Sequence, residues 1–97
     1  MKPSEALEQY RSDIRRVVEE NCARNPRVFG SAVHGADTEE SDLDILVDPI
    51  DGKTTLMSLA RIKREIEKIT GVETDVLTPM ALHERYRGEV LAEAKPV

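Results

Sequence analysis

The stretch DLDILV near the middle of the chain constrains the fold more than any other part of the sequence. In an extended strand, successive side chains point to opposite faces. Leu43, Ile45 and Val47 would therefore share one face. Asp42 and Asp44 would share the other. The stretch therefore predicts a strand with one apolar side and both carboxylates on the opposite side.

The rest of the chain alternates between helical and extended patterns. Apolar residues recur at helical spacing in three segments, and short apolar runs bounded by turn residues indicate two further strands. The predicted order is a helix from Ser4 to about Asn25, a strand at 27–29, a short helix or turn within 32–40, the strand at 42–47, a helix at 56–69, a strand at 72–77 and a last helix. Gly71 is expected to end the helix at 56–69. The last helix should start at Thr78-Pro79, with Leu82, Tyr86 and Val90 as its apolar stripe. The tail at 95–97 is expected to fray. This alternation predicts an α/β domain with a small three-stranded sheet.

Length and charge narrow the possible functions. With 97 residues, we expect a single domain over residues 1–97, too short to add a separate substrate-recognition domain. A net charge of −5 argues against stable, sequence-independent binding of nucleic acid, because such binding comes from Lys and Arg. No apolar run reaches the roughly 20 residues of a membrane-spanning helix, and the N-terminus is too polar for a secretory signal. We therefore expect no membrane association and a cytoplasmic location.

Two patterns close together indicate a site for phosphates and metal ions. Glycine at position 30 lets the backbone approach a ligand closely, and a helix beginning at Ser31 would aim backbone N–H groups at an anion such as a triphosphate. Asp42 and Asp44 could share hard cations such as Mg²⁺. Taken singly, either pattern is better explained by an ordinary turn or by the solvent face of an edge strand. Aspartate is a poor strand former, however, so two aspartates in a strand just after a Gly-Ser turn favour a functional site.

The run Gly30-Ser31, nine residues, and then SDLDILV resembles the signature of the polymerase-β-type nucleotidyltransferase superfamily. The short chain, the Leu77-Thr78-Pro79 after the last strand and the final helix resemble the minimal nucleotidyltransferases that act as antitoxins to HEPN-family ribonuclease toxins. The resemblance covers residues 28 to about 96. It implies a polymerase-β-like nucleotidyltransferase fold, in which a small mixed three-stranded sheet is flanked by helices.

The resemblance also implies the roles of particular residues. In that superfamily a third carboxylate on a later strand completes the metal site, and Asp75 is the matching position here. Glu73, two residues earlier and on the same strand face, is its nearest competitor. Asp42, Asp44 and Asp75 would then be the catalytic residues and the ligands of two Mg²⁺ ions. Gly30 and Ser31 would bind the nucleotide, with ATP as the substrate.

A departure from the family pattern concerns its one charged position. Superfamily members usually read Gly-Ser-x-Ala-Arg-Gly, whereas this chain has His34 where the arginine would be. A histidine is mostly uncharged at neutral pH, so His34 would hold a phosphate only weakly. A solvent-facing His34 and a phosphate contact remain open alternatives, and the departure bears on nucleotide affinity rather than on metal binding.

The implied activity is transfer of AMP from ATP to a tyrosine hydroxyl of a partner HEPN toxin, which the transfer would neutralise. A partner protein that supplies the acceptor explains the absence of a substrate domain. Two alternatives remain. The chain could neutralise a toxin by binding alone, with a degenerate metal site. It could also transfer nucleotides to a small molecule, for which a homo-oligomer could build a pocket between subunits.

Overall fold

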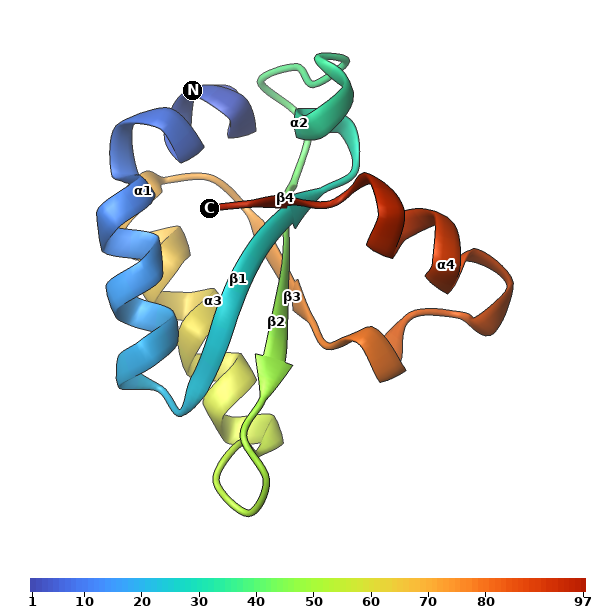
Figure 1. Cartoon of the computed structure of the whole chain (residues 1–97). Helices are drawn as coiled ribbons and strands as arrows, with labels where there is room; N and C mark the ends of the chain where they lie inside the picture. The colour runs from blue at the N-terminus through green and yellow to red at the C-terminus, as the bar shows by residue number, and fades with distance from the viewer.

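A computed structural model describes residues 1–97 as one four-stranded sheet with helices on both sides (Figure 1). The strand order is β3-β2-β1-β4, with β2 parallel to β3 and both other pairs antiparallel. The elements are α1 (Pro3–Glu20), β1 (Ala23–Phe29), α2 (Ser31–His34), β2 (Leu43–Pro49), α3 (Leu56–Thr70), β3 (Thr74–Leu77), the 3₁₀ turn η1 (Pro79–Ala81), α4 (Glu84–Glu93) and β4 (Lys95–Pro96). The mixed α/β fold is confirmed, with one strand more than the sequence predicted.

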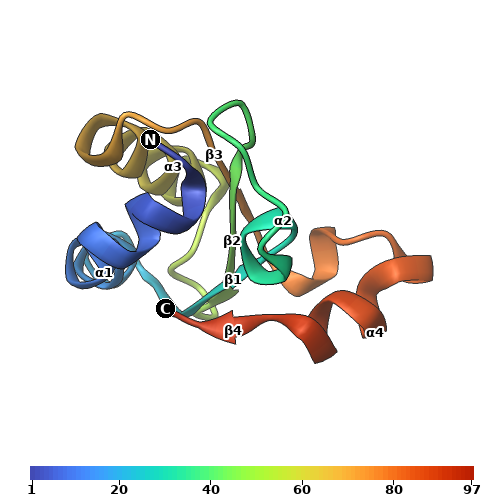
Figure 2. The same cartoon turned by 90° about the horizontal axis from the view of Figure 1, so that it is seen from above.

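The apolar face of β2 forms the centre of the core. Leu43, Ile45 and Val47 are fully buried and belong to one cluster with residues of α1 and α3. Viewed from above, α1 and α3 lie together on one side of the sheet, whereas α2, η1 and α4 lie on the other (Figure 2). The alternation seen in the sequence therefore places Asp44 on the side of the sheet away from the α1–α3 layer.

The predicted ends of the two long helices differ in accuracy. α3 ends at Thr70, followed by Gly71 with φ +73°, as the sequence predicted. The prediction that the first helix reaches Asn25 was wrong, because α1 stops at Glu20. The Asn21 side chain donates a hydrogen bond to the Val17 carbonyl at 2.8 Å and ends the helix there. β1 therefore starts earlier than predicted, with an irregular register between residues 24 and 27.

The C-terminal tail is part of the sheet, so the prediction of a frayed tail was wrong. β4 pairs antiparallel with β1, and the Val97 N–H donates to the Pro26 carbonyl at 3.0 Å. Arg15 on α1 donates to the Val97 carbonyl at 2.9 Å. Val97 is only 7% exposed, because these long-range contacts, invisible to a local pattern, fold it against the core cluster.

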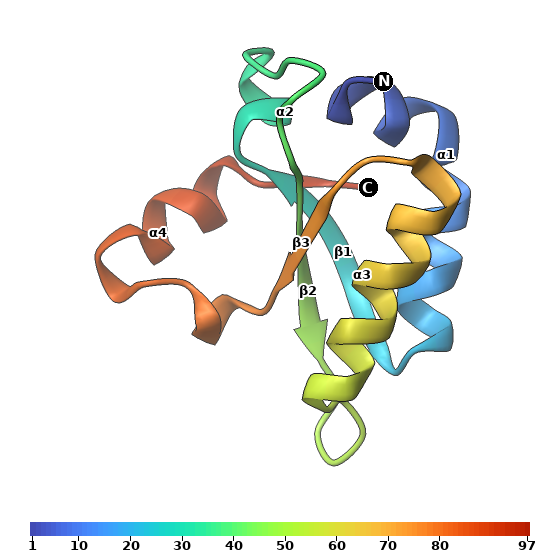
Figure 3. The ribbon, with the colours of Figure 1, turned by 180° about the vertical axis from the view of Figure 1, so that it is seen from behind.

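The second face of the sheet is covered in part by η1 and α4, which extend to one side of the molecule (Figure 3). Leu46 on this face is fully buried and Leu82 is nearly so. The prediction of one continuous last helix was wrong, since the chain is extended at Leu82 and His83 caps α4 through a 3.0 Å bond from the Arg85 N–H. The displaced stripe leaves Tyr86 53% exposed. None of the helices combines the length and the apolar character that a membrane span requires.

Candidate active site

Gly30 places the turn between β1 and α2 directly over Asp44. Its backbone φ of +75° is an angle that residues other than glycine rarely adopt. A Cβ atom at this position would lie 2.3 Å from the Asp44 Oδ2 atom. Glycine is thus required both by the backbone conformation and by the close approach. The approach brings the start of α2 next to a carboxylate.

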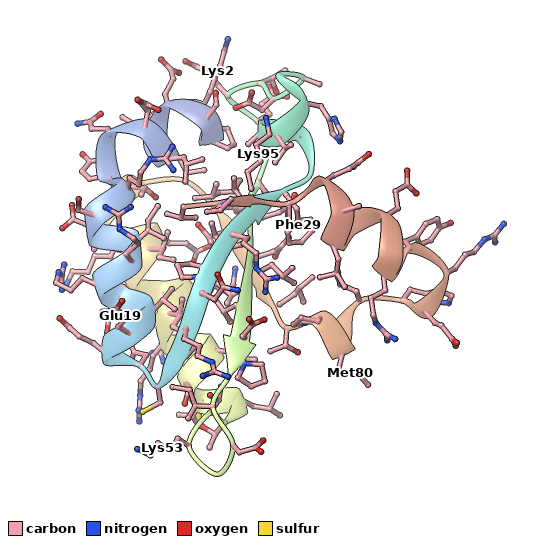
Figure 4. All side chains as sticks on the ribbon, in the orientation of Figure 1. Lys2, Glu19, Phe29, Lys53, Met80 and Lys95 are labelled. Atoms are coloured by element: carbon pink, nitrogen blue, oxygen red, sulfur yellow. The ribbon has the colours of Figure 1, made fainter.

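Asp44 and Asp75 are direct neighbours on adjacent parallel strands. The register pairs Asp44 with Asp75 on one side and with Phe29 on the other. Paired residues on neighbouring strands project to the same face, which here is the face turned toward α4; Figure 4 labels Phe29 there. Asp42 immediately precedes β2. The three sequence-predicted aspartates therefore lie at the same end of the same two strands.

The competitor Glu73 lies just before β3, and its carbonyl accepts a 2.8 Å bond from the Leu43 N–H. The register that follows from this bond sets Glu73 beside Asp42 and sets Asp75 beside Asp44. Glu73 and Asp42 both line an open depression of about 240 Å³, together with Glu39 and Glu40. Asp75 is the carboxylate that shares the row of Asp44 and Phe29.

No cationic side chain balances the negative charges of Asp42, Asp44 and Asp75. Burial, and then the negative charges of Asp75 and Asp42, raise the pKa of Asp44 from 3.8 to about 6. Asp44 is partly buried, whereas Asp42 and Asp75 are exposed. None of the three forms an ion pair with Lys, Arg or His. Their side chains also accept no hydrogen bond within the chain, so the site is a concentration of uncompensated negative charge.

The carboxylate oxygens do not converge into a ready-made ligand set. No group of three or more His, Cys, Asp or Glu side chains stands in metal-binding geometry. The donor set that Asp42, Asp44 and Asp75 can offer is made of hard oxygen atoms alone, which suits Mg²⁺ and not a thiolate- or imidazole-bound metal.

On the phosphate side of the site, the side chains of Ser31 and His34 differ in their contacts. The Ser31 hydroxyl makes no hydrogen bond within the chain, and the first turn of α2 leaves backbone N–H groups without helical partners. His34 instead meets α4, where its Nε2 atom lies 3.0 Å from the Oε2 atom of Glu93. That contact joins α2 to the end of α4, and no local pattern predicts it because the two residues are 59 positions apart.

Sequence reasoning missed the residue that holds the loop between α2 and β2. Asp37 is 9% exposed, and it accepts a 2.7 Å bond from the Ser4 N–H at the start of α1. Burial raises the pKa of Asp37, but hydrogen bonds from Ser4 and from the Asp37 backbone, with the charge of Lys2, together lower it by more, so the net pKa is below its ordinary value. The only signal in the sequence was an aspartate in a polar loop, and nothing local assigns it a partner 33 residues away.

The sequence pattern of the nucleotidyltransferase domain matches residues 11–97 of the chain. This chain belongs to the nucleotidyltransferase domain family. A relative of this chain in Methanocaldococcus jannaschii, named as a protein adenylyltransferase, is 41% identical over 70 residues, which is 72% of this chain and 74% of the relative. A second relative so named, from the same organism, is 26% identical over 83 residues, covering 86% of this chain and 84% of the relative.

Solved structures agree with this assignment. One described as a minimal nucleotidyltransferase superposes with a TM-score of 0.85 at 37% identity, over 97% of this chain and 95% of that one. A crystal structure of a toxin–antitoxin with AMP-PNP has a TM-score of 0.73 at 17% identity, covering 88% of this nucleotidyltransferase and 69% of that chain. The second likeness shows a shared fold. Together they confirm the minimal nucleotidyltransferase architecture that the sequence resembled.

Proposed function

We propose that this nucleotidyltransferase transfers AMP from ATP to a tyrosine hydroxyl of a HEPN-type toxin protein and thereby acts as its antitoxin. The observation that carries the proposal is the row of Asp44 and Asp75 on adjacent strands, with Asp42 beside it and the Gly30 turn against Asp44. This arrangement combines a place for phosphates with a place for the cations that accompany them.

The residues present fit Mg²⁺. Burial and the negative charges of Asp75 and Asp42 raise the pKa of Asp44, and no Lys, Arg or His side chain balances these charges. A divalent cation is the chemical group that would balance them. Asp42, Asp44 and Asp75 would hold the ions, in line with a two-ion site. Bound Mg²⁺ would neutralise charge on the triphosphate and ease deprotonation of the acceptor hydroxyl.

The chain's own residues would position the reactants. The Gly30 turn and the Ser31 hydroxyl would hold the β- and γ-phosphates and leave the α-phosphorus facing the strands. The acceptor oxygen would attack that phosphorus, so that a new P–O bond forms while the bond to the β-phosphate breaks and pyrophosphate leaves. Asp75 is exposed and would accept the hydroxyl proton.

Two facts support a protein as the acceptor. Two relatives of this chain are named as protein adenylyltransferases, and a structure with the same fold is a toxin–antitoxin complex with a nucleotide analogue. Within the chain itself, the side chains of Asp42 and Asp75 are exposed, so the carboxylate row opens to solvent. A macromolecular acceptor would supply the missing walls of the site.

Neutralisation by binding alone is the second candidate. One observation favours it: His34, which stands where the superfamily usually has an arginine, is engaged by Glu93 and is half exposed. A phosphate contact from this position would require breaking that pair. The intact set of aspartates favours the enzyme, because a surface that only covers a partner has no need of unpaired carboxylates beneath a glycine turn.

The test is transfer of label from α-³²P-ATP with Mg²⁺, with and without a candidate toxin encoded next to the gene. The wild type is compared with the double variant Asp42→Ala/Asp44→Ala. Label on the toxin that depends on the two aspartates and on Mg²⁺ is the expected result. A control reaction with γ-³²P-ATP should leave the toxin unlabelled, because the γ-phosphate departs in pyrophosphate.

Two outcomes would contradict the proposal. Label that persists in the double variant would place the chemistry elsewhere. Absence of label, together with toxin inhibition that survives the double substitution, would leave an antitoxin that acts by binding.

A further inference from the structure

Two side chains of α3 hold the outer edge of β3 in the way that a neighbouring strand would. β3 is an edge strand, paired only with β2. The Thr74 N–H donates to the Glu67 Oε2 atom at 3.0 Å. The Thr74 carbonyl accepts from the Lys63 Nζ atom at 2.7 Å. One N–H and one C=O of the same residue, both pointing away from β2, are therefore bonded by one helix.

The two side chains also bind each other. Lys63 and Glu67 are one helical turn apart, and the Lys63 Nζ atom lies 3.0 Å from the Glu67 Oε2 atom. The three bonds form a closed triangle between the ammonium group, the carboxylate and the Thr74 peptide groups. Such reciprocal bonding fixes the direction of the strand edge more firmly than any one of the bonds alone.

The triangle lies next to a residue of the candidate site. Thr74 is 1% exposed and immediately precedes Asp75. Thr74 pairs with Leu43, which sets Asp75 opposite Asp44. A strand of four residues has few ladder bonds to fix its register, and a slip by one residue would turn Asp75 to the opposite face of the sheet.

The pKa shifts of Glu67 and Lys63 have their main causes in these same hydrogen bonds. The hydrogen bond from the Thr74 N–H is the main cause that lowers the pKa of Glu67, and the bond to Glu67 is the main cause that raises the pKa of Lys63. The carboxylates of Asp75 and Glu73 also raise the pKa of Lys63 slightly. Lys63 therefore stays charged beside β3 across the neutral range.

We infer that Lys63 and Glu67 are positioning residues for nucleotidyl transfer: by gripping the backbone of Thr74 they hold Asp75 in register with Asp44. The inference rests on the proposed function for the role of Asp75. Neither side chain touches the reacting atoms, so both act through the strand. Residues that orient a metal-binding side chain typically change metal affinity or activity by about 10- to 100-fold when they are removed.

The test compares Glu67→Leu and Lys63→Met with Arg16→Met, a matched control. Arg16 forms an ion pair with Glu20 across one turn of α1, at 3.2 Å, and the pair touches no strand backbone. A third variant, Glu67→Gln, keeps an oxygen that can accept the Thr74 N–H. Three quantities are measured: Mn²⁺ affinity by electron paramagnetic resonance, hydrogen exchange of the Leu43 amide by NMR, and kcat and KM for ATP.

We expect Glu67→Leu to weaken Mn²⁺ binding and to lower kcat by about tenfold each, with little change in KM for ATP. Lys63→Met should move the same quantities in the same direction. The Leu43 amide, which bonds to the Glu73 carbonyl, should exchange faster in both variants. Glu67→Gln should recover most of the loss, and Arg16→Met should behave as wild type.

The inference is overturned if Glu67→Leu and Lys63→Met match Arg16→Met in Mn²⁺ affinity and in Leu43 exchange. If Glu67→Leu does not fold, Lys63→Met and Glu67→Gln carry the comparison. Should the wild type transfer no label, the proposed function fails by itself. Mn²⁺ affinity and amide exchange would then still decide whether the two residues hold Asp75 in place.

Discussion

Asp44 and Asp48 lie on the same strand and the same face, four residues apart, yet the protein treats them differently. Asp48 accepts a 2.5 Å bond from the Arg27 guanidinium and a 2.9 Å bond from the Asn25 amide. Asp44 has no such partner, and two further carboxylates stand beside it. The half of the face around Asp48 is thus neutralised from within the chain, whereas the half around Asp44 is left charged.

The difference separates a carboxylate that stabilises the fold from one that is left available to a ligand. A partly buried carboxylate is normally paired, because an unpaired charge away from water costs folding free energy. Asp48 follows this rule and contributes to the packing of β1 on β2. Asp44 breaks it, so at neutral pH its charge opposes folding. A violation confined to one end of two strands is the pattern expected where a ligand supplies the missing cation.

The largest effect should come from removing the charge of Asp44, with the same substitution at Asp48 as the comparison. Asp44→Asn should lower nucleotidyl transfer on the order of 10³-fold or more, because it removes charge at the reacting centre. Asp48→Asn should leave transfer near the wild-type rate and lower stability instead. Initial rates with α-³²P-ATP and urea unfolding curves measure the two effects. Comparable losses of transfer in both variants would refute the division of the face.

A second prediction concerns the turn that covers Asp44. Gly30→Ala would force a Cβ into the Asp44 carboxylate and impose a positive φ on alanine, at a cost of about 1–3 kcal/mol for the backbone alone. Transfer should be lost as Asp44 is displaced. Gly52→Ala is the matched control, since Gly52 also has a positive φ, +74°, but open space around its Cβ position. Equal stability losses in the two variants would show that the contact with Asp44 is unimportant.

The paired half of the face can be broken through its cation. Arg27→Met leaves Asp48, whose side chain is 31% exposed, with only the Asn25 amide as a partner. We expect a loss of about 1–3 kcal/mol in the free energy of unfolding. Arg16→Met removes an exposed ion pair on α1 and should cost no more than about 0.5 kcal/mol. Chemical denaturation of both variants at pH 7 gives the comparison.

The smallest effect is the dependence of stability on pH. The folded-state pKa of Asp44, about 6, lies above its ordinary value of 3.8, so the folded state holds the proton more tightly. The contribution to stability is therefore full below about pH 4 and is lost as pH rises through 6. Allowing for screening by solvent, wild type should lose about 1–2 kcal/mol relative to Asp44→Asn between pH 4 and pH 7.

Unfolding curves of wild type and Asp44→Asn across this range measure the difference. Added Mg²⁺ should restore the lost stability of wild type at pH 7 and leave Asp44→Asn unchanged. Parallel pH profiles for the two proteins would argue against a perturbed Asp44.

The sequence could predict the parts of the fold that depend on residues close together along the chain. The alternation of Leu43, Ile45 and Val47 defined the buried face of β2, and Gly71 marked the end of α3. The position of Gly30 before a short helix could also be predicted. The close approach of Gly30 to the Asp44 carboxylate, which would put a Cβ atom 2.3 Å from Oδ2, could not. That approach depends on how two strands meet in space.

The predictions that failed involve contacts between distant segments. Val97 looked like a loose end, yet Pro26 and Arg15 hold it in place. Tyr86 lay on an apparent apolar stripe, but the break at Leu82 leaves Tyr86 53% exposed while Leu82 itself stays buried. For the candidate site, Gly30, Asp42 and Asp44 were predicted from spacing, and Asp75 was predicted from the family resemblance. The support from Asp37 could not be found, because its partner lies across the fold.

Both edges of the sheet have features that discourage the addition of another strand. On the β1 side the edge is β4, a strand of two residues that includes a proline, which has no N–H to donate. On the other side, the outward-facing peptide groups of Thr74 are already bonded to α3. Self-association through strand pairing is therefore disfavoured, and a second protein has the open face and the helices as its route of approach.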